Sequence, residues 1–166
     1  MCNLKKMAYI VKTFIPNSKD KEVIVNLDNV PVLIGGSSNS DQELYRPMFV
    51  TEKDIDTGLG KGDFIIKEDF LSCCKNFVKV RCIKKIFSSF SYELRNVYIN
   101  KKAIVTIPVY HKEYSVEVKG EEKLVDYAEV TLALFNYNKE KTTETIDIHW
   151  KDIDFLINSL LGDNEF

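Results

Sequence analysis

The residues best suited to chemistry lie close together in DIHWKDID, residues 147–154. This stretch holds the only Trp and one of the two His residues, with three Asp beside them. On a β-strand, Asp147 and His149 would project from one face about 6.5 Å apart, because side chains alternate and each residue rises about 3.3 Å. That separation suits two ligands of one metal ion. A working site needs a further ligand, for which His111 is a candidate.

The same stretch also fits a strand that leads into a helix. Five apolar residues recur at helical spacing after Asp152, namely Ile153, Leu156, Ile157, Leu160 and Leu161. Asp152 is placed to cap this helix, and Asp154 falls in its first turn, where negative charge is favoured. Every residue except His149 then has a structural role. We therefore favour a strand and a capped helix over a catalytic or metal site, and we expect no catalytic residue, metal or cofactor.

Two further patterns resemble chemical sites. GLGKGD, residues 58–63, has the spacing GxGxG rather than GxGxxG and does not clearly link a strand to a helix. We interpret it as a loop. The four Cys form no CxxC pair, which favours buried, reduced thiols over a metal site, including the adjacent Cys73 and Cys74.

Most of the chain alternates apolar and polar residues, which is typical of strands. The pattern predicts three antiparallel pairs: 7–15 with 22–27, 91–100 with 101–110, and 124–137 with 142–150. It also predicts a strand near 77–86 and helices near 67–76 and 152–161, with a single longer helix over 67–87 as the alternative. We expect one α+β domain over residues 1–166, with a flexible tail at 1–6 and a twisted, mostly antiparallel sheet of roughly seven to nine strands.

A basic stretch, KVRCIKK at residues 79–85, is the strongest argument for nucleic-acid binding. On a strand, Lys79 and Arg81 would share one face, with aromatic residues nearby, as in single-strand binding platforms. The aromatic residues are nevertheless spaced like core residues, and the net charge of the chain is −2. A solvent-facing basic strand is the simpler interpretation, and nucleic acid is the disfavoured partner.

Charge is divided unevenly along the chain. Residues 121–166 contain four Lys and eleven Asp or Glu, which gives −7, and the first 120 residues carry +5. An acidic surface in the last quarter would suit a basic partner, because complementary charge speeds association. We expect the partner to contact Glu129, Glu144, Asp147 and His149 on the last two strands. A solvated face that keeps the protein soluble is the alternative.

These features predict a non-catalytic, protein-binding domain. No apolar run approaches 18 residues, and the run at 7–11 is too short for a secretion signal, so we expect a cytoplasmic location and no membrane contact. In general character the chain resembles bacterial immunity proteins that neutralise toxins, and small phage proteins that block host defences. That resemblance implies an inhibitor of a basic partner such as a toxin nuclease. The alternatives are a metal-dependent hydrolase or nuclease using Asp147 and His149, and a nucleic-acid-binding β-domain using residues 79–85.

Overall fold

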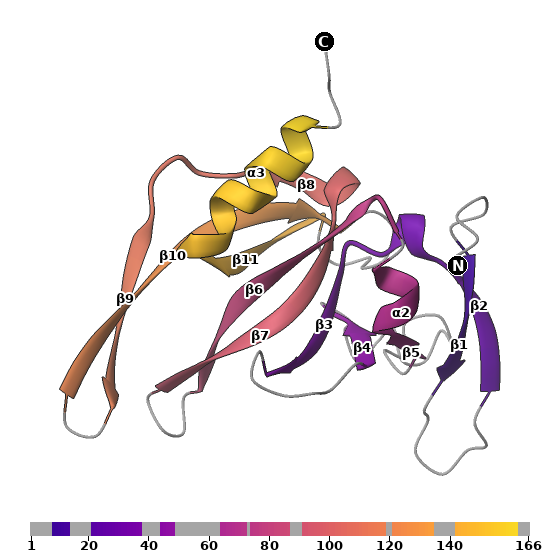
Figure 1. Cartoon of the computed structure of the whole chain (residues 1–166), viewed down its shortest axis with the longest axis horizontal. Helices are drawn as coiled ribbons and strands as arrows, with labels where there is room; N and C mark the ends of the chain where they lie inside the picture. Colours follow the sequence, from indigo (N-terminus) through magenta and orange to yellow (C-terminus); the bar gives the residue numbers. More distant parts are fainter. Residues whose placement is uncertain are drawn as a thin grey trace.

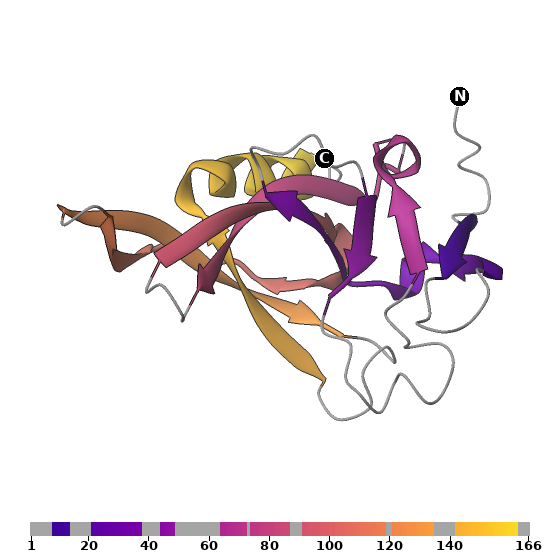
Figure 2. The ribbon, with the colours of Figure 1, turned by 90° about the horizontal axis from the view of Figure 1, so that it is seen from below.

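The described strands join into one antiparallel sheet. The computed structural model describes residues 8–13, 21–37, 44–48, 64–72, 74–86, 91–118, 121–134 and 142–162. The strand order is β2-β1-β5-β4-β3-β7-β6-β11-β10-β8, and β9 also pairs with β10 (Figure 1). Seen from below, the sheet is strongly curved (Figure 2).

The strands and helices have the following bounds. The strands are β1 (Ala8–Thr13), β2 (Lys21–Asn26), β3 (Val32–Ser37), β4 (Leu44–Pro47), β5 (Phe64–Lys67), β6 (Phe77–Ile86), β7 (Ser91–Asn100), β8 (Ile104–Thr106), β9 (Lys112–Val118), β10 (Glu121–Ala133) and β11 (Thr143–His149). The α-helices are α2 (Glu68–Leu71) and α3 (Ile153–Gly162). The 3-10 turns are η1 (Leu27–Asn29), η2 (Lys101–Ala103) and η3 (Trp150–Asp152). The expected loop at 51–63 and the expected tail at 1–6 lie outside the described residues, as do Cys2 and Cys73.

Much of the predicted architecture is confirmed. The pairs predicted at the two ends of the chain are present as β1 with β2 and β10 with β11. The strand predicted near 77–86 is β6. A mostly antiparallel sheet with a C-terminal helix fits the α+β class broadly. The alternation of apolar and polar residues predicted these strands correctly because successive side chains of a strand point to opposite faces of the sheet.

The predicted hairpin of 91–100 with 101–110 is wrong. β7 pairs instead with β3 and β6, and β8 pairs with β10. The reason lies in Asn100, which is fully buried: its amide nitrogen donates to the carbonyls of Asp28 and Val30, and its Oδ1 accepts the backbone N–H of Lys102. These bonds form the η2 turn and direct the chain away from β7.

The second helix predicted near 67–76 is not present at that length. The described residues there contain only α2, a single four-residue turn, and its N-cap residue Lys67 makes no side-chain cap bond. Leu71, Cys74 and Phe77 do pack in one cluster, but Val78 belongs to a different cluster. The chain is therefore already extended at Phe77, with alternate residues on opposite faces of the sheet.

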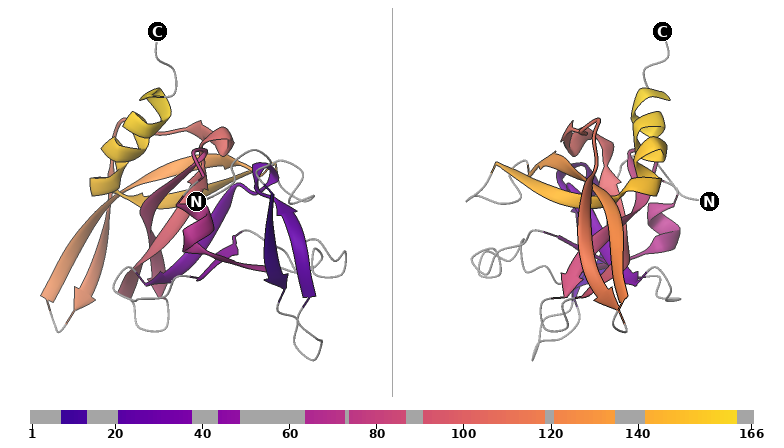
Figure 3. Two further views of the ribbon diagram at one scale, coloured as in Figure 1. Left: turned by 45° about the vertical axis from the view of Figure 1, so that its right-hand side comes forward. Right: turned by 90° about the vertical axis from the view of Figure 1, so that its left-hand side faces the viewer.

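The main core lies between the strands and α3. Ile153 and Leu156 of α3 are buried against Val80 of β6, Val130 of β10 and Ile148 of β11, all of which belong to one cluster. Figure 3 shows α3 lying along one side of the sheet. We call the side of β10 and β11 that carries Val130 and Ile148 the core face, and the opposite side the outer face.

Candidate functional site

Three of the four predicted partner-binding residues share the outer face of β10 and β11. Glu129 is directly opposite Asp147, and His149 is opposite Tyr127. Glu144 is opposite Leu132, which is fully buried in the core cluster. Side chains alternate along β11, so Glu144 lies on the core face at the end of the strand and does not share the surface of the other three.

The outer face places two carboxylates side by side. Like charges directly opposite each other on antiparallel strands are destabilising. Lys112 of β9 offsets part of this repulsion, because its ammonium contacts the Glu129 carboxylate at 3.0 Å. The hydrogen bond that Lys112 donates to Glu129 raises the pKa of Lys112. Lys112 reaches Glu129 because β9 pairs with β10 and brings Lys112 opposite Tyr127.

A pocket adjoins these charges at the edge of the sheet. It measures about 360 Å³ and is lined by Thr106, Pro108, Tyr110, Lys112, Glu129 and Thr131. The β8–β10 pairing shifts its register beside the pocket: Ile104 lies opposite Leu132 and packs against the core, whereas Thr106 lies opposite Thr131 on the outer face. Such irregularities redirect side chains at sheet edges.

The pocket was missed at the level of sequence. Pro108 in residues 101–110 signals an interrupted edge strand, and that is the only local hint of it. The rim beside the pocket is exposed, since Val109 is 93% and Tyr110 65% accessible. Aromatic residues are enriched at protein interfaces, which makes this rim a candidate contact surface.

His149 has a structural role after all. Its Nδ1 accepts the backbone N–H of Lys151 at 3.2 Å and so caps the η3 turn. Burial, followed by the positive charge of Arg81, lowers the pKa of His149. The neutral ring that the cap requires is therefore favoured. A His followed by a tight turn is a weak sequence signal for this role, and it was not recognised.

Asp152 binds β6. Its carboxylate accepts the backbone N–H of Arg81 at 2.8 Å and the guanidinium Nε and Nη2 at 2.9 and 2.8 Å. β11 pairs with β6 only between Ile148 and Cys82, so the carboxylate takes the place of the next strand contact. Burial raises the pKa of Asp152, but the bonds from Arg81 outweigh it and the net shift is downward.

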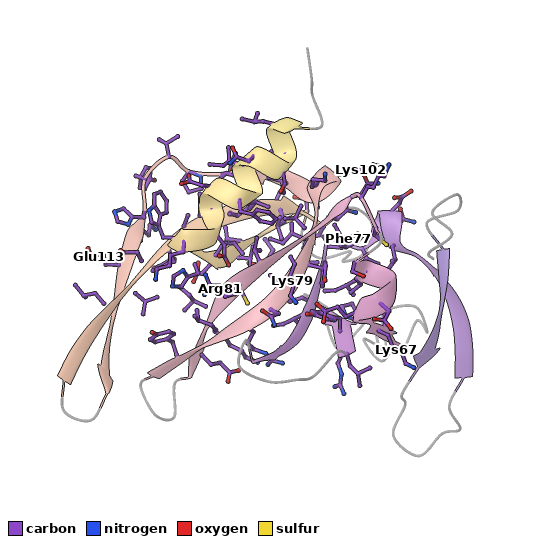
Figure 4. The ribbon with its side chains drawn as sticks, in the orientation of Figure 1. Lys67, Phe77, Lys79, Arg81, Lys102 and Glu113 are labelled. Carbon is purple, nitrogen blue, oxygen red and sulfur yellow. The ribbon has the colours of Figure 1, made fainter. Side chains whose placement is uncertain are left out.

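Two cations of the basic strand are paired with carboxylates. Lys79 and Arg81 do share a face of β6, as predicted, and Lys79 bonds to Glu68 of α2. Figure 4 shows both side chains on β6, between α2 and the start of α3. The same Glu68 oxygen also accepts hydrogen bonds from the hydroxyl groups of Tyr98, at 3.0 Å, and Tyr45, at 3.4 Å. Neither of these two cations is left unpaired to contact a phosphate, so the face shared by Lys79 and Arg81 gives nucleic-acid binding no support.

The His that could have completed a metal site is engaged elsewhere. The His111 ring stacks on Trp150 with centroids 4.6 Å apart, and its Nδ1 lies 3.6 Å from Asp126. Within the part of the chain that the structure describes, no group of three or more His, Cys, Asp or Glu side chains is arranged to hold a metal ion. Asp147 and His149 therefore gain no third ligand among those residues.

Comparisons with protein-family models, curated protein sequences and solved structures give no match to this chain. Of the helices in the described ranges, none is long and apolar enough to span a membrane. Any functional assignment therefore rests on the arrangement of the residues themselves.

Proposed function

We propose that this chain is a non-catalytic binding protein of the immunity or inhibitor type. It neutralises a basic protein, such as a bacterial toxin nuclease, by occluding the functional surface of that protein. The contact surface is the outer face of β10 and β11, with Glu129, Asp147 and His149, together with the pocket beside them.

The observation that carries this proposal is the direct opposition of Glu129 and Asp147 on neighbouring strands. Carboxylates at neighbouring positions concentrate negative charge at one place on this face, which complements a cationic group of the partner. A basic partner therefore gains favourable electrostatic energy at this place. Complementary charge also speeds association and selects against acidic partners.

The surroundings of the two carboxylates fit a protein contact. Exposed Val109 and Tyr110 supply apolar and aromatic area next to the charges. Interfaces combine such a patch with a polar rim. The pocket supplies a recess for a protruding side chain, which is how anchor residues are held at interfaces.

The test compares three tagged proteins as baits in lysate of the cells that encode the chain. The first is the natural sequence, the second carries Glu129→Gln with Asp147→Asn, and the third carries Glu144→Gln. We expect the natural protein to retain one basic protein at low salt, and the double variant to retain at least about tenfold less. High salt should weaken the capture, and the purified natural protein should inhibit the activity of the captured partner.

Glu144→Gln is the matched control, because it removes one carboxylate from the same hairpin on the core face. It should capture the partner as the natural protein does. Equal capture by all three baits would remove this face from consideration. Retention of nucleic acid alone would favour the nucleic-acid alternative instead.

A further inference from the structure

The connection between β8 and β9 carries the exposed rim beside the pocket (Figure 1). At one end of this connection, Ile107 packs against the main core. At the other end, the ring of His111 stacks on Trp150, with ring centroids 4.6 Å apart and the two planes tilted by 32°. Val109 and Tyr110 lie between these two attachments and are exposed. The stack of His111 on Trp150 therefore helps to fix the position of the rim.

His111 also faces a carboxylate. Its Nδ1 lies 3.6 Å from a carboxylate oxygen of Asp126 on β10, and the two side chains are 42% and 44% accessible. The pairing of β9 with β10 places Glu113 opposite Asp126, which adds negative charge beside the ring. A protonated His111 would gain from these carboxylates and from the π-system of the Trp150 indole.

The other charged and titratable groups near the stack come from every neighbouring element. They are Tyr110 of the connection, Lys112 of β9, Tyr127 and Glu129 of β10, His149 of β11, Lys151 and Asp152 of η3, and Arg81 of β6. Lys112 contacts Glu129 at 3.0 Å, and Arg81 contacts Asp152 at 2.8 Å. Lys151 opposes a positive charge on His111, whereas Asp126 favours it.

The second His of the chain is in the opposite situation. The Nδ1 of His149 accepts the backbone N–H of Lys151, which requires a neutral ring. Burial, followed by the positive charge of Arg81, lowers the pKa of His149. His149 therefore keeps its place as a neutral acceptor, and a proton taken up beside Trp150 is better accommodated at His111.

We propose that His111 is a pH-sensitive latch for the β8–β9 connection, which tightens on Trp150 and Asp126 when its imidazole takes up a proton. The tightened latch holds Val109 and Tyr110 in place, and loss of the proton loosens it. Histidine suits this role because its side chain changes charge near neutral pH. A cation–π contact and an ion pair are both weak at exposed sites, so together they shift the ratio of held to released connection by about three- to tenfold. The latch does not depend on the proposed function, although the residues that it holds belong to the proposed contact surface.

The fluorescence of Trp150, which is the only Trp of the chain, tests the proton uptake. An imidazolium in contact with an indole quenches its emission more strongly than a neutral imidazole does. We expect the emission of the natural protein to fall as the pH is lowered from about 8 to about 5.5. His111→Phe keeps an aromatic ring against the indole but takes up no proton, so this fall should be absent. His149→Asn should retain it.

Nitrogen-15 relaxation tests whether the rim follows the latch. The backbone amides of Val109 and Tyr110 should be less mobile at about pH 5.5 than at about pH 7.5 in the natural protein. The difference should be absent in His111→Phe. It should be smaller in Asp126→Asn, because the protonated ring loses the carboxylate that it faces. Asp154→Asn, which removes an exposed carboxylate from α3, is the control and should behave as the natural protein does.

Quenching that persists in His111→Phe, or that disappears in His149→Asn, would overturn the latch, since the proton would then act at another residue. Equal mobility of the rim at both pH values in the natural protein would also overturn it, because the stack would then not hold the connection. These measurements need no partner, whereas the capture experiment varies Glu129 and Asp147 at one pH. Failure of the latch and failure of the proposed function are therefore distinguishable.

Discussion

At the scale of single residues, His149 and Asp152 have structural roles different from those that the sequence suggested. Asp152 was expected to cap the C-terminal helix, yet it bonds to Arg81 of β6. His149 was the residue without a role, yet its Nδ1 caps η3. Arg81 interacts with both residues: it binds Asp152, and after burial it is the next cause of the lowered pKa of His149.

The lowered pKa of His149 predicts a loss of stability as the pH falls below neutral. In the unfolded chain the imidazole takes up a proton near its ordinary value of 6.5. In the folded protein it does so only at lower pH. Between the two values the unfolded state binds more protons, so acidification from about pH 7 to pH 5.5 favours unfolding.

Urea unfolding of the natural protein and of His149→Asn at these two pH values measures the effect. Asn keeps an acceptor at the N-cap position but cannot take up a proton in this range. The difference in unfolding free energy between the two pH values should be smaller in the variant. Identical differences in both proteins would mean that His149 does not carry this pH dependence.

At the scale of elements, the bond between Asp152 and Arg81 fixes the start of α3 to the sheet. The backbone pairing of β11 with β6 is short, since only Ile148 and Cys82 pair among the described residues. The carboxylate reaches across at this point and satisfies both the backbone and the side chain of Arg81. The helix then places Leu156 in the core.

Asp152→Asn should therefore destabilise the protein by about 1–3 kcal/mol, because a charged, three-bond contact is replaced by a weaker one that leaves Arg81 partly unsatisfied. Asp154→Asn is the matched control: it makes the same change two residues later, on an exposed side of α3. That variant should lose no more than about 0.5 kcal/mol. Chemical denaturation measures both, and equal losses would contradict the anchoring role.

At the scale of the whole molecule, the charge division along the chain does not become a division in space. Acidic residues of the last quarter contact basic residues of the first 120: Asp152 with Arg81, and Glu129 with Lys112. The segment of −7 is thus partly neutralised by strands that lie beside it. The proposed interface relies on the local opposition of Glu129 and Asp147 rather than on an acidic quarter.

The sheet is unevenly connected, which predicts uneven stability. β6 and β7 pair over ten residues, from Phe77 with Asn100 to Ile86 with Ser91. β1 joins the rest of the sheet only through two described pairs with β5, Lys12 with Ile65 and Thr13 with Phe64. Because so few described pairs connect this hairpin to its neighbour, we expect it to open separately from the main core.

Hydrogen exchange followed by NMR tests this prediction. Amides of the β1–β2 hairpin, such as those of Ile10 and Ile24, should exchange at least about tenfold faster than those of Val80 and Val97, which pair in the centre of the sheet. Similar protection at the two places would mean that the whole sheet opens as one unit.

The sequence by itself determined the features that depend on neighbours along the chain. Alternation identified β6, β10 and β11 and placed Asp147 and His149 on one face, because consecutive strand residues point to opposite sides. Helical spacing identified α3 and its buried residues Ile153 and Leu156. These patterns needed no knowledge of the rest of the molecule.

Only the tertiary structure decided what depends on partners far away in the sequence. Arg81 and Asp152 are 71 residues apart, and the amide of Asn100 binds a carbonyl 70 residues away. Three other features also depend on distant residues. They are the pairing partners of β7, the short length of α2, and the pocket beside the register shift between β8 and β10. Each is set by which strands pack together, and strand pairing is a long-range choice that local periodicity leaves open.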